Sequence, residues 1–126
     1  MENIFDYSSP LYMQVKEKIE ALILKGDIQD GEKLPSTSEM VHYYKLNHLT
    51  IAKGVQCLVD EGIVYKKKGS GTFLQQGGRE KLLRKKQERF EAHYIRPLLE
   101  EAKRLNLDSE TVIDWIRRTK EREMNE

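Results

Sequence analysis

The sequence predicts a mainly α-helical protein with one small β-hairpin: an N-terminal winged helix-turn-helix followed by a C-terminal two-helix tail. Residues 10–62 hold three short segments with helix start and stop signals, and residues 63–74 hold two strand-like runs joined by a glycine turn. A Gln-Gly-Gly stretch at residues 76–78 then precedes a charged helical segment. We therefore expect one domain over residues 1–76 and a helical tail over residues 77–126.

The first helix is expected to begin at Ser9-Pro10, because serine is a favourable cap and proline suits the first helical position. It is expected to end at Lys25-Gly26, with a cation in the last turn and a glycine beyond it. Between these signals, apolar residues recur at spacings of three and four: Leu11, Val15, Ile19, Leu22 and Ile23.

The second and third helices have their own caps. Ser36 and Glu39 form a capping-box pattern, and Asn47 is a good cap for the helix that follows. Glu61-Gly62 is the expected end of the third helix. The buried sides are expected to hold Met40, Val41 and Tyr44 in the second helix, and Ile51, Val55, Leu58 and Val59 in the third.

The hairpin is expected to pair Ile63-Val64-Tyr65 with Thr72-Phe73-Leu74, since both runs are rich in β-branched and aromatic residues. The connection between them carries three consecutive lysines, Lys66–Lys68, and then Gly69-Ser70-Gly71. This is a basic, glycine-turned tip.

The tail is expected to form a long helix with a kink or break at Tyr94–Arg96, ahead of Pro97, and a last helix capped by Asp108. Two such helices bury their apolar side chains better against a partner than within themselves, so we predict dimerisation. Packing of the tail on its own winged domain is the alternative. The residues assigned to dimerisation are Leu82, Phe90, Tyr94, Leu98, Leu99, Val112, Ile113, Trp115 and Ile116.

Composition narrows the class of protein. The chain has 126 residues, 34% of them charged, and a formal net charge of +1, which permits nucleic-acid binding without indicating it. No signal-peptide pattern and no long apolar run occur, and the single Cys57 excludes an internal disulfide framework. We therefore expect a cytoplasmic protein with no membrane partner.

Enzymatic and metal chemistry find no support in the residue spacing. No nucleophile–base pair, paired carboxylates or phosphate loop stands at a usable spacing, so we expect a protein that is not an enzyme and has no cofactor. His42, His48, His93 and Cys57 match no ligand motif, so no metal site is expected.

Three elements suit DNA instead. In a helix-turn-helix the third helix enters the major groove by its first residues, where Asn47, His48 and Thr50 can bond base edges or phosphates. Lys53, one turn on, suits phosphate or guanine. The amides at the Ser36 helix start can bind a phosphate, and the hairpin supplies Lys66, Lys67 and a close backbone approach at Gly69, Ser70 and Gly71.

These residues resemble the DNA-binding domain of the GntR family of bacterial transcription regulators. The matching stretches are Pro10-Leu11-Tyr12-Met13-Gln14, Gly31-Glu32-Lys33-Leu34-Pro35-Ser36, Thr50-Ile51, Leu58, Glu61-Gly62 and Gly69-Ser70-Gly71-Thr72-Phe73. The resemblance implies DNA contacts at Lys33, Ser36, Thr50, Gly69, Gly71 and Thr72. The short tail resembles that of the YtrA-type subgroup, which implies a homodimer held by those helices.

The chain departs from the family pattern at four positions. Ser38 and His48 stand where the family usually has arginine, and Ala52 replaces another frequent basic residue. Lys45 stands where glycine usually makes the turn between the helices. Fewer basic contacts at Ser38 and His48 predict weaker DNA binding or a different operator.

The leading hypothesis is a dimeric, sequence-specific transcriptional repressor that binds a palindromic double-stranded DNA operator. Its third helix would lie in the major groove and its wing on the adjacent backbone or minor groove, provided that residues 47–53 and 66–71 project from one side. The alternative is a winged-helix protein-interaction module that has lost specific operator binding. A small-molecule effector, if there is one, would use a dimer cleft or a hinge at Gln75–Gly78.

Overall fold

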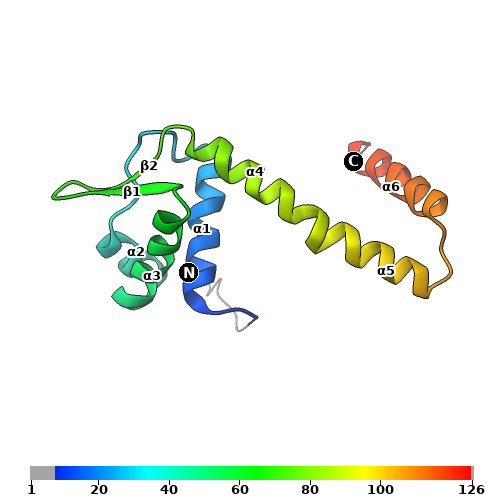
Figure 1. Cartoon of the computed structure of the whole chain (residues 1–126), viewed down its shortest axis with the longest axis horizontal. Coiled ribbons are helices and arrows are strands. Elements are labelled where there is room, and N and C mark those ends of the chain that lie inside the picture. The colour runs from blue at the N-terminus through cyan, green and yellow to red at the C-terminus, as the bar shows by residue number, and fades with distance from the viewer. Residues whose placement is uncertain (1–7, 126) are drawn as a thin grey trace. The chain divides into compact units, whose positions relative to one another are not determined.

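The computed structural model describes residues 8–125 and divides the chain into two compact units, up to Arg84 and from Lys85 onward. The first unit holds α1 (Leu11–Lys25), α2 (Thr37–Tyr44), α3 (His48–Asp60), β1 (Val64–Lys67), β2 (Gly71–Leu74) and the start of α4 (Gly78–Phe90). The second holds the rest of α4, the π-helical segment η1 (Glu91–Ile95), α5 (Arg96–Arg104) and α6 (Ser109–Met124). Figure 1 shows the three helices and the hairpin of the first unit, and the winged helix-turn-helix fold is confirmed.

Local hydrogen bonds fix the starts of α2 and α3. The Ser36 hydroxyl accepts a hydrogen bond from the Glu39 amide at 3.0 Å, and the Glu39 carboxylate accepts one from the Ser36 amide at 2.9 Å. Asn47 Oδ1 accepts from the Thr50 amide at 2.8 Å. Both predicted caps are confirmed. Between the helices Lys45 adopts the left-handed conformation, with φ 56° and ψ 39°.

The start of α1 differs from the prediction by one residue. Pro10 is itself the cap residue, with φ −56° and ψ 142°, and no side chain caps this helix. The prediction that Ser9 caps it is therefore wrong. The Ser9 carbonyl instead accepts a hydrogen bond from Nε2 of the buried Gln14 side chain, which ties the entering chain to the first turn. The end is as predicted, because Gly26 takes the left-handed conformation that glycine adopts without a steric penalty.

The hairpin is antiparallel and pairs Val64 with Leu74, Tyr65 with Phe73, Lys66 with Thr72 and Lys67 with Gly71. Residues 31–34 lie along the other edge of β2, since Leu34 donates to the Thr72 carbonyl at 2.8 Å and the Leu74 amide donates to Glu32 at 2.9 Å. This third, irregular edge connects the wing directly to the start of α2.

One apolar core joins these elements. It consists of Val15, Ile19, Ile23, Ile28, Leu34, Met40, Ile51, Val55, Leu58, Ile63, Val64, Leu74 and Leu82. Leu82 is only 1% exposed within this cluster, so it is a core residue of the winged unit. Its assignment to the dimerisation surface is wrong, because a side chain that fills the core of its own subunit is not available to a partner.

The junction into α4 is a fixed part of the first unit. The Asp30 carboxylate accepts hydrogen bonds from the Gly77 amide at 2.8 Å and the Arg79 amide at 3.2 Å. Gly78 is buried against Leu74 and the Ile63 carbonyl. The boundary predicted after residue 76 therefore falls inside this unit, and residues 75–78 are bonded to it instead of forming a free linker.

The expected irregularity before Pro97 takes the form of the π-helical segment Glu91–Ile95. The Arg96 amide donates to the Glu91 carbonyl, five residues back, and the backbone stays helical at Phe90, Ile95 and Arg96. The wider turn accommodates a proline that has no N–H to donate. A π-helical turn thus replaces the predicted break. Asp108 caps α6 as predicted, accepting from the Thr111 amide at 2.8 Å.

Candidate nucleic-acid interface

The N-terminus of α2 presents backbone amides outward. The capping box occupies the amides of Ser36 and Glu39, which leaves those of Thr37 and Ser38 in the first turn. The two hydrogen bonds with Ser36 hold the pKa of the Glu39 carboxyl below its ordinary value, so this carboxylate stays ionised and locked in the cap. The free amides at the positive end of the helix dipole suit an anionic oxygen.

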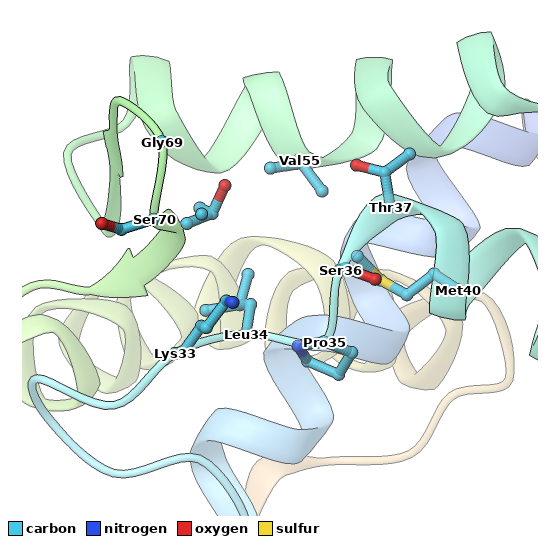
Figure 2. Close-up of a pocket in the computed structure, with 11 residues that line it drawn as sticks. Lys33, Leu34, Pro35, Ser36, Thr37, Met40, Val55, Gly69 and Ser70 are labelled. Carbon is cyan, nitrogen blue, oxygen red and sulfur yellow. The ribbon is translucent and has the colours of Figure 1, made fainter.

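The wing tip faces this helix start across a pocket of about 370 Å³. Figure 2 shows Gly69 and Ser70 of the hairpin on one side, Ser36 and Thr37 on the other, and Val55 of α3 beside the opening. The pocket is lined by Lys33, Leu34, Pro35, Ser36, Thr37, Met40, Val55, Gly69, Ser70, Gly71 and Thr72. Six predicted DNA-binding residues therefore meet here, namely Lys33, Ser36, Gly69, Ser70, Gly71 and Thr72.

Lys33 and Gly71 lie next to one another in the lining of this pocket. Gly71 has φ +118°, and a Cβ atom built on it would lie 2.6 Å from Lys33 Cε. The left-handed backbone at Gly71 favours glycine, and a side chain there would displace the end of the Lys33 side chain. The Lys33 side chain lines the pocket beside the start of α2.

The start of α3 is largely exposed. Asn47 and His48 are exposed and Thr50 is half-buried, while Ser38 of α2 is exposed as well. Leu49 is 80% exposed, an unusual position for a large apolar side chain. Its apolar surface suits contact with a thymine methyl group. The sequence prediction named neither Leu49 nor Thr37 as a DNA-binding residue, because a single leucine or threonine carries no signal without knowledge of its exposure.

Two predicted DNA-binding lysines have intramolecular contacts. The Lys53 ammonium lies over the Tyr12 ring of α1, 4.0 Å from its centroid, in a cation–π contact. The Lys66 ammonium donates a hydrogen bond to Gln56 Oε1 of α3 at 2.8 Å. Lys67 and Lys68 are exposed, and their ammonium groups have no hydrogen bond or ion pair with other residues in the range 8–125.

The second unit exposes most of its apolar side chains. Among its described residues only Ala102 is buried. The predicted dimerisation residues Phe90, Tyr94, Leu98, Leu99, Ile113, Trp115 and Ile116 are 38–65% exposed, and Val112 is half-buried. Phe90 and Tyr94 contact each other, with ring centroids 5.3 Å apart. Within one chain these helices form no core of their own.

Other kinds of site find no support in residues 8–125. No group of three or more histidine, cysteine, aspartate or glutamate side chains gathers there in a metal-binding arrangement. No helix in that range has the length and apolar character needed to cross a membrane.

Comparison with known proteins identifies relatives over most of the chain. The family model described as "Bacterial regulatory proteins, gntR family" matches residues 11–74. The HTH-type transcriptional repressor YtrA of Bacillus subtilis is 28% identical over 110 residues, which cover 87% of this chain and 84% of YtrA. This match supports the YtrA-type subgroup.

Solved structures extend the likeness to the fold. A GntR family transcriptional regulator from Listeria monocytogenes superposes with a TM-score of 0.77 and 26% identity, covering 90% of this chain and 98% of that one. AraR(DBD), solved in complex with operator ORR3, matches with a TM-score of 0.52 and 34% identity over 56% of this chain and 84% of that chain.

Proposed function

The chain belongs to the GntR family of bacterial regulatory proteins, and we propose that it is a dimeric repressor that binds a palindromic DNA operator. The relative YtrA is named a transcriptional repressor, and AraR(DBD) was solved in complex with an operator. In this proposal the exposed start of α3 enters the major groove, with Asn47, His48, Leu49 and Thr50 next to base edges. Ser38 of α2 contacts the adjacent backbone.

The observation that carries the proposal is the pocket between α2 and the wing. The first turn of α2 at Thr37, the Lys33 side chain and the hairpin turn at Ser70 line one opening beside α3. A DNA phosphate placed there would be bound by helix-terminal amides and by lysine charge together. The same placement would lay Lys67 of the wing along the neighbouring backbone or minor groove.

Selection of bound sequences from a random DNA pool tests this proposal. We expect a recovered palindrome whose affinity, measured by fluorescence anisotropy, falls steeply with salt. Lys33→Ala and Lys67→Ala should each reduce the slope of log K against log [salt] by about one, because each removes one phosphate contact. Lys25→Ala is the matched control, since Lys25 is an exposed lysine at the far end of α1 whose loss should leave the slope unchanged.

His48→Ala should instead relax sequence preference at one position of each half-site, at about 1–3 kcal/mol for the preferred base. Recovery of no common sequence from the pool would refute operator binding. That outcome would favour the alternative, a protein-interaction module, for which Ser38 and His48 in place of basic residues are the motivating observation.

Dimerisation through the second unit is the other half of the proposal. Its exposed apolar side chains on α5 and α6 would be buried in a symmetric interface, which would also set two α3 helices about 34 Å apart along the duplex. Light scattering of the full chain at tens of micromolar should give the mass of a dimer. Leu99→Glu with Ile116→Glu should yield a monomer, whereas Met124→Glu, at an exposed position near the end of α6, should not.

A further inference from the structure

We propose that Lys66 is a positioning residue that holds the wing against the recognition helix, and that Lys67 and Lys68 alone supply the wing's charge to DNA. The inference deepens the proposed function and rests on it for the DNA-binding half. Its basis is a chain of hydrogen bonds that joins β1 to α3 through Gln56.

The connection has two short links. Lys66 Nζ donates to Gln56 Oε1 at 2.8 Å, and Gln56 Nε2 donates to Asp60 Oδ1 at 2.8 Å. Gln56 and Asp60 are one turn apart on α3, so the glutamine amide lies between a cation and an anion. Each link involves an ionised group and is therefore stronger than a neutral hydrogen bond, and each polarises the amide in the same direction.

Strand alternation explains why Lys66 differs from its neighbours. Side chains in β1 point to opposite faces in turn, and Val64 is buried on the face that packs on α3. Lys66, two residues on, shares that face, and its cross-strand partner is Thr72. Lys67 shares the outer face with Tyr65, whose ring stacks on Phe73 with centroids 5.7 Å apart. Lys66 and Lys67 therefore lie on opposite faces of the hairpin, and Lys68 follows in the turn.

The charge of Lys66 is already partly compensated inside the protein. Asp60 lies at the other end of the hydrogen-bonded chain, so binding a phosphate would require Lys66 to leave Gln56 and the nearby anion. Lys67 and Lys68 carry no such cost, because their side chains bond to nothing else in residues 8–125. Counterion release on DNA binding is expected from the uncompensated lysines.

The position of the wing then depends on Lys66. The hairpin is a two-stranded sheet with short strands, and its tip extends beyond the core residues Val64 and Leu74. Two-stranded hairpins are marginally stable alone. Residues 31–34 bond to β2, and the Lys66–Gln56 bond ties β1 to α3 near the tip, so the two contacts together fix the angle at which Gly69–Gly71 meets the pocket. Lys66 supplies the contact with α3.

A DNA-independent measurement tests the contact itself. In ¹H–¹⁵N spectra of the full chain, the Gln56 side-chain amide signals should shift on Lys66→Ala and stay close to their original positions on Lys67→Ala. Lys66→Arg keeps a donor at the same place and should preserve them. Unchanged Gln56 signals in Lys66→Ala would overturn the inference whether or not the protein binds DNA.

DNA binding tests the consequence. With the selected duplex, or with a mixed-sequence duplex of about 30 base pairs if selection recovers none, Lys66→Ala should weaken affinity severalfold while leaving the salt slope unchanged. Gln56→Ala should have a similar effect, and the double variant should be no weaker than either single one. Lys67→Ala should lower the slope by about one.

Two results would reject the assignment of Lys66. One is a drop in slope for Lys66→Ala equal to that of Lys67→Ala, which would make both lysines phosphate ligands. The other is full additivity between Lys66→Ala and Gln56→Ala. If every variant, Lys67→Ala included, binds the duplex as the wild type does, the proposed function fails. The spectra then still decide whether Lys66 holds the wing against α3.

Discussion

Gly54→Ala should destabilise the winged unit, although alanine is the better helix former. Gly54 lies inside α3 and is buried where α3 crosses α1. A Cβ atom built there would lie 2.8 Å from the Tyr12 carbonyl oxygen and 2.9 Å from Val15 Cγ1. Both atoms belong to α1, and neither is the end of a flexible side chain. The methyl group therefore fits only if the two helices separate.

The magnitude follows from two opposing terms. Replacing a helical glycine by alanine gains about 1 kcal/mol from backbone entropy. Overpacking of a tight core costs about 1–3 kcal/mol, and the upper part of that range applies because Val15 is fully buried and the Tyr12 oxygen is backbone. We expect a net loss of about 1–2 kcal/mol in the free energy of unfolding, equivalent to roughly 4–16 °C in Tm for a unit of this size.

Urea denaturation followed by circular dichroism, at one fixed protein concentration, measures the change. Ala52→Gly in the same helix is the matched control, since it should cost about 1 kcal/mol from propensity alone. Wild-type stability or a gain for Gly54→Ala would show that α1 and α3 do not meet as closely as the structure has them. A loss of stability in both variants would support the close contact of α1 and α3. The Gly54→Ala variant should also bind the operator less tightly.

Three further changes have defined outcomes. Lys16→Ala removes a buried ammonium from Glu61 and should cost about 3 kcal/mol in urea unfolding, whereas Lys25→Ala, from an exposed pair, should cost less than about 1 kcal/mol. Lys45→Gly relieves the left-handed backbone and should raise stability by about 1 kcal/mol; a lower Tm would contradict that strain. Hydrogen bonds with Thr111 lower the pKa of Asp108, so its stabilising effect is present above about pH 4 and lost as the pH falls through the folded-state pKa. Asp108→Asn keeps the cap and should flatten the pH dependence of Tm below pH 4.

The sequence determined the local structure of this protein. The Ser36–Glu39 box, the Asn47 cap and the Asp108 cap each join residues three apart, so the side chain and the amide it bonds occur in one short window. The hairpin followed in the same way from β-branched runs around a glycine turn. These signals were sufficient to predict the winged helix-turn-helix and the tail helices.

The candidate site was predicted only in outline. The residues that line the pocket between α2 and the wing belong to recognisable motifs, and six of them were named from the sequence. The individual roles of the lysines could not be predicted. Lys66 and Lys67 are equivalent in the sequence, and they differ only once strand alternation and the position of Gln56 are known. Leu49 was not named as a DNA-binding residue, since its exposure depends on how α3 packs.

Only the tertiary structure decided which side chains meet across the chain. It placed Leu82 in the core of the winged unit, laid the Lys53 ammonium over Tyr12, and brought Gly54 against the backbone of α1. The contacts of Lys53 and Gly54 with α1 join residues at least 39 positions apart, and their distances are set by how whole helices pack. Amino-acid patterns specify the face that a helix buries; the depth and angle at which two faces meet come from packing the complete core.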